Sequence, residues 1–326
     1  MKRRILAAAA GAALALASLA ACGDSGSDSG SGSGSDKITL GFSQVGAESG
    51  WRTANTKSIK EEAAAAGIDL KFADAQQKQE NQIAAIRSFI KQKVDVIAFS
   101  PVVVTGWDAV LKEAKAAGIP VVLTDRAVDS DPSMYVTFLG SDFVEEGKKA
   151  GQWLVDEYKD SDETVNIVQL EGTVGAAPAI DRKKGFAEVI KADPNLKVIA
   201  SQSGEFTRAK GKEVMQALLK AHKDIDVLYA HNDDMGLGAI QAIEEAGKKP
   251  GEDIKIITVD AVRDGMQALA DGKINFIVEC NPLLGGQLME IVKKVHADEP
   301  VERRIVTEET VFDQEAAKKA LPSRQY

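Results

Sequence analysis

Cysteine, histidine and aromatic residues are scarce in this chain of 326 residues. It has two cysteines, three histidines and an aromatic content of 5%. The histidines do not have the spacing of a metal-ligand set. No phosphate-binding P-loop is present, and Gly236-Leu237-Gly238 lacks the third glycine of a dinucleotide fingerprint. We therefore expect no metal and no cofactor, and the sequence argues against a nucleotide-dependent enzyme.

Long apolar runs are also absent, with one exception at the N-terminus. Three basic residues at positions 2–4 precede an apolar run over residues 5–21, which is short for a membrane span. This pattern is typical of a secretory signal. The run ends in Leu19-Ala20-Ala21-Cys22, which resembles the lipobox of bacterial lipoproteins, where Cys22 carries lipid and becomes the first mature residue. Ordinary cleavage after small residues, with Cys22 uninvolved, is the alternative.

Residues 22–35 are almost wholly Gly, Ser and Asp after the cysteine, which predicts a flexible tether between an anchor and a folded body. Removing the signal, residues 1–21 with their three positive charges, changes the formal net charge from −9 to −12. So acidic a body argues against a nucleic-acid partner. If Cys22 carries lipid, Cys280 has no disulfide partner, and we interpret it as a buried packing residue.

Short β-branched runs alternate with helical patterns along the body. Residues 37–42, 69–73, 94–99 and 120–123 predict strands, and spacings such as Ile83, Ile86 and Ile90 predict helices between them. The second half repeats this rhythm, with strands predicted at 165–170, 198–201, 227–230 and 254–259 and helices near 180–191, 208–221 and 239–246. We predict an α/β fold of two lobes, each a parallel sheet flanked by helices.

The two halves resemble each other where a buried strand ends in a carboxylate. Residues 95–98 lead through a helix to Thr124-Asp125, and residues 226–230 lead through a helix to Thr258-Val259-Asp260. Ligands of open α/β sheets lie outside the carboxyl ends of the strands. Two lobes that face each other would therefore place Asp125 and Asp260 in one cleft.

Other polar and aromatic side chains also follow predicted strands or open helices. They are Trp51-Arg52, Arg126, Asp181-Arg182, Phe206 and Asn232. Charged and amide groups bind hydroxyls strongly, and an aromatic ring covers an apolar C–H face, so the set suits a sugar.

Each of these residues also has a structural interpretation. Trp51 could cover the core at a helix start, Asp125-Arg126 could be a surface ion pair, and Phe206 could be core packing. Asn232 could cap a helix, a role that does not exclude ligand binding. We expect Asp233 and Asp234 to be a solvated first helical turn, favoured by the helix dipole.

Several blocks of this sequence resemble the galactofuranose-binding proteins of bacterial sugar ABC transporters, which are ribose- and galactose-type periplasmic binding proteins. The resemblance covers residues 37–279, and its blocks are SQVGAESGWR at 43–52, QQKQENQ at 76–82, PVVVTGW at 101–107, DRKKGF at 181–186, FTR at 206–208 and AHNDDM at 230–235. These blocks are long and specific. The chain from Leu283 onward is less distinctive.

The resemblance implies a two-lobed type I binding-protein fold with three inter-lobe crossovers. The lobes would comprise residues 36–138 with about 281–311, and residues 139–280 with about 312–326. Ligand-binding positions implied by motif are Glu48, Trp51, Arg52, Asp125, Arg126, Arg182, Phe206, Asn232 and Asp260. Ribose-type relatives have two adjacent aromatics where this chain has Trp51-Arg52, which favours the galactofuranose branch. Relatives commonly place an amide near position 280, where this chain has Cys280 beside Glu279, so that contact is left unassigned.

The resulting expectation is an extracytoplasmic, lipid-anchored monomer that captures a monosaccharide and delivers it to an ABC permease and its ATPase. It is expected to bind the sugar without transforming it. Another sugar, ribose-like or a hexopyranose, and a sensory role remain open. Asp125 and Asp260 could in principle hydrolyse a glycoside, a more distant alternative. A repressor of related fold would begin with a helix-turn-helix rather than a signal.

Substitution of the lipobox cysteine tests the anchor. We expect Cys22→Ala to release the protein from the membrane fraction while the body still folds, because the lipid would be the attachment. Fractionation of cells that express the variant, with circular dichroism of the released protein, measures both. Unchanged membrane retention would contradict the lipobox.

Overall fold

The computed structural model describes residues 37–326. The predicted signal, the lipobox with Cys22 and the tether lie outside these residues. No helix within residues 37–326 has the length and apolar character needed to cross a bilayer.

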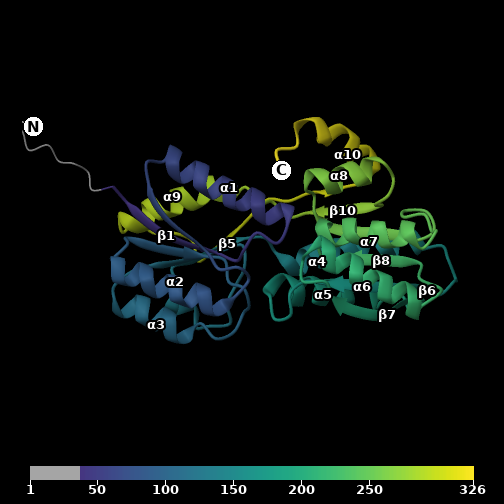
Figure 1. Ribbon diagram of the computed structural model, residues 1–326, viewed down its shortest axis with the longest axis horizontal. Coiled ribbons are helices and arrows are strands. Elements are labelled where there is room, and N and C mark those ends of the chain that lie inside the picture. The colour runs from purple at the N-terminus through teal and green to yellow at the C-terminus, as the bar shows by residue number, and fades with distance from the viewer. Residues whose placement is uncertain (1–36) are drawn as a thin grey trace, which may run out of the picture. The chain divides into compact units, whose positions relative to one another are not determined.

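The first sheet contains six parallel strands in the order β11-β5-β4-β3-β1-β2. These strands are β1 (Thr39–Gln44), β2 (Asp69–Asp74), β3 (Val96–Phe99), β4 (Val121–Thr124), β5 (Thr137–Gly140) and β11 (Arg304–Val306). Helices α1 (Gly50–Ala65) and α9 (Gly285–His296) pack on one face through an apolar core that includes Phe42, Ile59 and Leu288. Helices α2 (Gln79–Gln92) and α3 (Asp108–Ala116) cover the other face, where Trp107 is fully buried (Figure 1).

The second sheet has the order β12-β10-β9-β8-β6-β7, and only β12 is antiparallel to its neighbour. Its strands are β6 (Val165–Glu171), β7 (Leu196–Ser203), β8 (Val227–Ala230), β9 (Lys255–Asp260), β10 (Phe276–Glu279) and β12 (Val311–Phe312). Helices α4 (Phe143–Tyr158) and α5 (Ala177–Ile190) cover one face. The other face carries α6 (Arg208–Ala221), α7 (Asp233–Glu245), α8 (Arg263–Ala270) and α10 (Gln314–Ala320). Two 3₁₀ turns, η1 (Pro132–Met134) and η2 (Leu321–Ser323), complete the elements.

The predicted fold class is confirmed by these two helix-flanked sheets. The chain passes between the sheets three times, at residues 141–142, 280–284 and 307–310. The predicted lobe boundary at residue 138 falls within β5, so we place that boundary after Gly140. The helical spacing predicted near 239–246 is the later part of α7, which begins at Asp233, directly after the helix cap considered at Asn232. The elements that were not predicted are β5, β10, β11, β12, α4, α8, α9 and α10.

Helices α4 and α5 pack with their backbones in close contact, and glycine makes this possible. A methyl group at Gly147 would collide with the carbonyl of Arg182, and one at Gly185 would collide with the carbonyl of Val144. Both neighbours are backbone atoms, which cannot move aside as a flexible side chain would. The α4–α5 contact therefore fixes the position of Arg182 in α5 relative to α4.

We expect Gly185→Ala to lower the free energy of unfolding by about 2–3 kcal/mol, because the added methyl group forces α4 and α5 apart. Gly286→Ala in α9 is the matched control, since a methyl group there meets nothing nearer than 3.9 Å. Alanine is the better helix former, so the control should be neutral or slightly stabilising. Urea unfolding followed by circular dichroism measures both, and equal stabilities would contradict the close-packing argument.

Candidate ligand-binding site

A cavity lies where residues from the two lobes converge. All nine residues predicted for the site line it: Glu48, Trp51, Arg52, Asp125, Arg126, Arg182, Phe206, Asn232 and Asp260. The lining also includes four residues that sequence reasoning did not assign, namely Ser49, Phe143, Pro178 and Cys280. The cavity is therefore formed by segments up to 232 residues apart in the chain, from Glu48 to Cys280.

The first lobe contributes a buried network of ion pairs around Arg52. Ser49 caps α1 by accepting a hydrogen bond from Arg52 N at 3.1 Å, which places Trp51 and Arg52 in the first helical turn. The Arg52 guanidinium contacts Glu48 Oε1 at 3.1 Å and Asp125 Oδ2 at 2.7 Å. Ser100 Oγ donates to the same Asp125 oxygen at 2.8 Å. Asp125 is thus part of a buried network, and the surface ion pair considered from sequence is excluded.

Both strand-end aspartates have backbone conformations that are unusual for non-glycine residues. The φ angle is 62° at Asp125 after β4 and 121° at Asp260 at the end of β9. Residues with positive φ carry strain that the surrounding structure must hold, and they gather at functional sites. Gly140 leaves room for Asp125 in this conformation, because a Cβ at position 140 would lie only 2.8 Å from the Asp125 carbonyl oxygen.

In the second lobe, Arg182 is the central cation. Its Nε lies 2.6 Å from Glu146 Oε2, its Nη1 donates to the carbonyl of His231 at 2.5 Å, and its Nη2 lies 3.8 Å from Asp260 Oδ1. The ring of Phe143 lies 5.1 Å from the guanidinium carbon and closes one side. These partners fix the direction of the guanidinium, which lines the cavity.

Asn232 combines helix capping with a position on the cavity wall. It is the N-cap of α7, where its side-chain oxygen accepts from Met235 N at 3.0 Å, and its amide donates to the carbonyl of Phe206 at 3.1 Å. One amide N–H remains for another partner. Phe206 itself is buried, and its ring lies directly over Gly172, where a methyl group would collide with it.

Four contacts join the two lobes around this cavity. The indole of Trp51 packs in the core of the second lobe, and its Nε1 donates to the carbonyl of Cys280 at 2.7 Å. Gly50 N donates to Asp234 Oδ2 at 2.7 Å, and Val104 N donates to Gly175 O at 2.9 Å. The guanidinium of Arg126 lies 5.3 Å from the ring of Phe206. Trp51 is therefore both a core residue and a cavity residue.

The charges of the cavity shift one another's pKa values. Burial alone would raise the pKa of Asp125, but Arg52 and Arg126 outweigh it and lower that pKa. Burial and the neighbouring Arg52 lower the pKa of Arg126 to about 10, which keeps it charged at neutral pH. Burial, with Asp233 and Glu146 nearby, raises the pKa of Asp260 although Arg182 opposes the shift. An ionised Asp125 is a hydrogen-bond acceptor and a poor general acid.

Two polar atoms of the cavity residues have no hydrogen-bond partner within residues 37–326. They are Glu48 Oε2 and Arg126 Nε, and both are buried. An unpaired buried polar atom costs about 1–3 kcal/mol. A ligand with several hydroxyl groups can satisfy both, because a hydroxyl donates to the carboxylate and accepts from the guanidinium.

The structure corrects the prediction that Asp233 and Asp234 are solvated. Both are buried. Asp233 accepts hydrogen bonds from Thr258 Oγ1 at 2.5 Å and from Val262 N at 2.7 Å. These two bonds hold residues 258–262, which include Asp260, in place. Asp234 binds Gly50 across the lobes. The sequence pattern of a charged first turn was misleading because the carboxylates bind backbone and side-chain donors of neighbouring segments rather than facing water.

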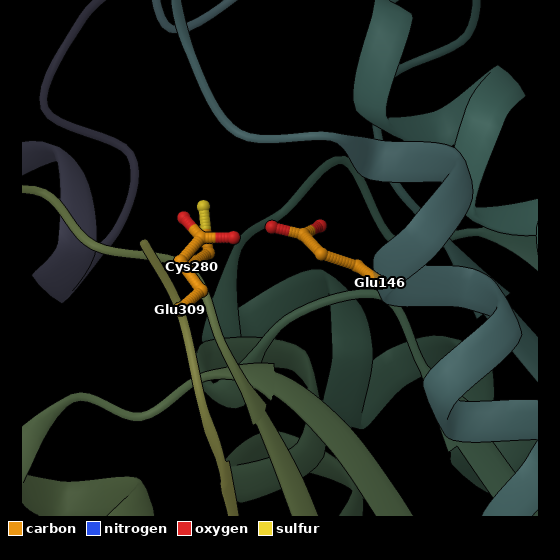
Figure 2. A group of neighbouring side chains, drawn as sticks. All are labelled: Glu146, Cys280 and Glu309. Atoms are coloured by element: carbon orange, nitrogen blue, oxygen red, sulfur yellow. The ribbon is translucent and has the colours of Figure 1, made fainter. Parts of the chain in front are cut away.

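Sequence reasoning missed Glu146, the partner of Arg182. A signal was available, since Glu146 lies between Phe143 and Ala150 at helical spacing on the buried face of α4. Glu146, Cys280 and Glu309 form a group that we call the hinge cluster, in which one atom from each residue lies within 4.8 Å of the others (Figure 2). Asp181 is half-buried and does not line the cavity.

Comparison with known proteins gives one consistent result. The family profile described as "Periplasmic binding protein domain" matches residues 40–299. The galactofuranose-binding protein YtfQ of Escherichia coli is 52% identical over 292 residues, which cover 88% of this chain and 91% of that protein. A solved protein from Mycobacterium smegmatis in complex with β-D-fucofuranose is 68% identical, covers 89% of this chain and 95% of its own, and has a TM-score of 0.88.

A second solved relative is the periplasmic binding protein of the arabinose ABC transporter from Shewanella sp. ANA-3, bound to α- and β-L-arabinofuranose. It is 52% identical, covers 88% of this chain and 96% of its own, and has a TM-score of 0.85.

We expect Asp233→Ala to lower the free energy of unfolding by about 1–3 kcal/mol, because Thr258 and Val262 N would lose their buried acceptor. Asp264→Ala is the control on the adjacent helix, where a half-exposed Arg208 pairs with an exposed carboxylate at 3.0 Å. That change should cost less than about 1 kcal/mol. Thermal or urea unfolding measures the stability of both variants. If Asp233→Ala were as stable as the parent, the result would contradict the buried role of Asp233 and favour the solvated helical turn.

Proposed function

Since the chain belongs to the periplasmic binding protein family, we propose that it is an extracytoplasmic, lipid-anchored solute-binding protein for a furanose sugar, with galactofuranose as its ligand. In this proposal the sugar is held between the two lobes and is delivered to the permease and ATPase of an ABC transporter. The family match covers residues 40–299, which includes every residue of the cavity.

The observation that carries the proposal is the convergence of nine polar and aromatic residues from both lobes on one small cavity. The set offers the two kinds of group that a monosaccharide needs. Charged and amide groups bind hydroxyls directionally, and the rings of Trp51 and Phe206 offer apolar faces.

The comparisons support a furanose within the sugars. Relatives above 50% identity are named for, or bound to, galactofuranose, fucofuranose and arabinofuranose. A ribose import binding protein of Bacillus subtilis is 33% identical. We assign galactofuranose because the E. coli relative is matched over 91% of its length and this chain has the Trp51-Arg52 pair.

The mechanism of capture follows from differential affinity. A sugar that contacts Asp125 and Arg126 on one lobe and Arg182 and Asn232 on the other binds the closed arrangement more tightly than an open one. Ligand therefore shifts the population toward closure. Asp125 accepts from sugar hydroxyls, Arg126 and Arg182 donate to sugar oxygens, and Trp51 covers one face of the ring.

The chain is a binding protein rather than an enzyme, as its relatives are. The two aspartates considered for glycoside hydrolysis each have an arginine partner, Arg52 at 2.7 Å from Asp125 and Arg182 at 3.8 Å from Asp260. Each carboxylate thus has a role in orienting a cation, and we propose that the sugar leaves the site unchanged.

Titration calorimetry with galactofuranose, arabinofuranose, ribose and galactopyranose tests the ligand. We expect the furanoses to bind, and Asp125→Ala or Arg182→Ala to weaken binding by about a hundredfold or more. Each change removes a proposed sugar contact and also takes an ion-pair partner from a buried charge, Arg52 or Glu146. Trp51→Ala should have an intermediate effect.

Two matched controls separate binding from nonspecific charge effects. Asp129→Ala and Lys183→Ala remove exposed groups of the same charges a few residues away, and they should bind like the parent. Circular dichroism confirms that each variant is folded. If folded Asp125→Ala and Arg182→Ala also bind like the parent, the site lies elsewhere. Binding of ribose or a hexopyranose alone would reject the furanose assignment.

A further inference from the structure

The three passages between the lobes meet at a single carboxylate. Glu309, in the third passage, accepts a hydrogen bond on Oε1 from Ser141 Oγ of the first passage. The same oxygen accepts from Asn281 N of the second passage at 3.0 Å and from Thr307 Oγ1 of its own at 2.9 Å. Three donors on one oxygen require an acceptor, so Glu309 is best satisfied as a carboxylate.

Glu146 faces this carboxylate from α4. Figure 2 shows its carboxyl group directed toward Cys280 and Glu309, which approach from the opposite side. The side chain is 1% exposed. Glu146 Oε2 pairs with Arg182 at 2.6 Å, whereas Oε1 has no hydrogen-bond partner within residues 37–326. One carboxyl oxygen of Glu146 therefore binds Arg182, which lines the ligand cavity, and the carboxyl group also faces Cys280 and Glu309 of the hinge cluster.

Titratable groups of both signs surround Glu146. The groups that act on it from the neighbouring elements are Arg182 of α5, Tyr229 of β8, Asp260 of β9, Cys280 after β10 and Glu309 of the third passage. Burial raises the pKa of the Cys280 thiol and of Tyr229, so both stay neutral. Arg182 is the cation in contact with Glu146, whereas Lys149 Nζ donates to the backbone carbonyl of Glu309 at 3.4 Å and Arg304 also acts on Glu309. Glu146 and Glu309 raise each other's charging cost if both are ionised, and a proton on one of them relieves that repulsion.

The geometry favours a proton on Glu146. Glu309 is occupied by three donors, and a cation at the hinge cluster would lie beside the Arg182 guanidinium, which already contacts Glu146. We propose that Glu146 is a positioning residue of the ligand site, which orients Arg182 through one oxygen and holds a proton against Glu309 through the other, so that sugar affinity depends on pH. This inference rests on the proposed function for its ligand.

The electrostatics of the cluster agree with this assignment. Burial is the largest influence and raises the pKa of Glu146, Arg182 opposes it, and Glu309 raises it further, to about 8. Below that pH Glu146 is neutral. Above it, Glu146 ionises, repels Glu309 across the hinge and competes with the ligand for Arg182. We therefore expect the affinity for an uncharged sugar to fall as the pH rises through about 8.

The same linkage affects stability. The unfolded chain would lose this proton near pH 4.5, whereas the folded chain keeps it up to about 8. Between these values the folded state binds more protons, so the contribution of Glu146 to stability is complete below about pH 4.5 and is lost as the pH rises to about 8.

The test compares the parent with Glu146→Gln, Glu146→Ala and Glu145→Gln, using the furanose that the parent binds, in buffers with and without EDTA. Glutamine keeps an acceptor for Arg182 but cannot ionise, and Glu145 is the exposed neighbour on the same helix. We expect the parent and Glu145→Gln to bind at least about fivefold more weakly at pH 9 than at pH 6.5. Glu146→Gln should bind within about threefold of the parent at pH 6.5 and lose less than about twofold by pH 9. Glu146→Ala should bind about tenfold or more weakly throughout, because Arg182 loses its partner.

Asp233 is a second buried acid in this range, since burial raises its pKa to about 7. Asp260 is a further buried acid whose pKa is raised by burial. The difference between the parent and Glu146→Gln isolates Glu146, because both proteins retain Asp233 and Asp260. A flat parent profile, or the same loss in Glu146→Gln, would overturn the proposal. So would a loss of binding in EDTA that zinc restores, because a cation would then balance the cluster.

Failure of the proposed function is distinguishable from failure of this inference. If no furanose binds at any pH, the function is wrong, and urea unfolding between pH 5 and 9 still tests the proton. We expect the parent to lose stability with rising pH more steeply than Glu146→Gln. Equal slopes would reject Glu146 as the proton carrier.

Discussion

A buried guanidinium keeps its charge, and the arrangement of this site follows from that constraint. Arg52, Arg126 and Arg182 are all buried at one cavity. Each must be paired with acceptors that are themselves held in place, because an unpaired buried charge costs several kcal/mol. Asp125 and Glu48 serve Arg52, and Glu146 and the His231 carbonyl serve Arg182. The fold places these acceptors in two ways. Unusual backbone angles set the positions of Asp125 and Asp260, and the glycine contacts between α4 and α5 bring Glu146 next to Arg182.

Much of the architecture could be predicted from periodicity, because parallel strands buried on both faces form apolar runs separated by helical spacings. The strand ends at Asp125 and Asp260 could also be located, since a carboxylate directly after a buried strand lies at the edge of the sheet where ligands bind. Six of the nine site residues lie within the motif blocks, and the other three, Asp125, Arg126 and Asp260, follow predicted strands. The cavity is lined by all nine. Their contacts with a ligand remain a prediction.

The rest depended on contacts between distant segments, which a single sequence does not reveal. Asp233 and Asp234 look like a solvated helix start because helix dipoles favour acids there. Their burial follows from the loop after β9 and from Gly50 of the other lobe. Glu146 and Glu309 come from unrelated stretches of sequence, and neither has a motif. Their meeting requires knowledge of where the chain passes between the lobes.

The contacts that join the lobes also determine how affinity is distributed over the molecule. Three hydrogen bonds, Trp51 with Cys280, Gly50 with Asp234 and Val104 with Gly175, join the two lobes through protein atoms alone. The apparent dissociation constant depends on the fraction of protein that is already competent to bind. Under the proposed transport function, natural variation at residues that never touch a sugar would therefore tune uptake at low nutrient concentration and leave the sugar specificity of the cavity unchanged.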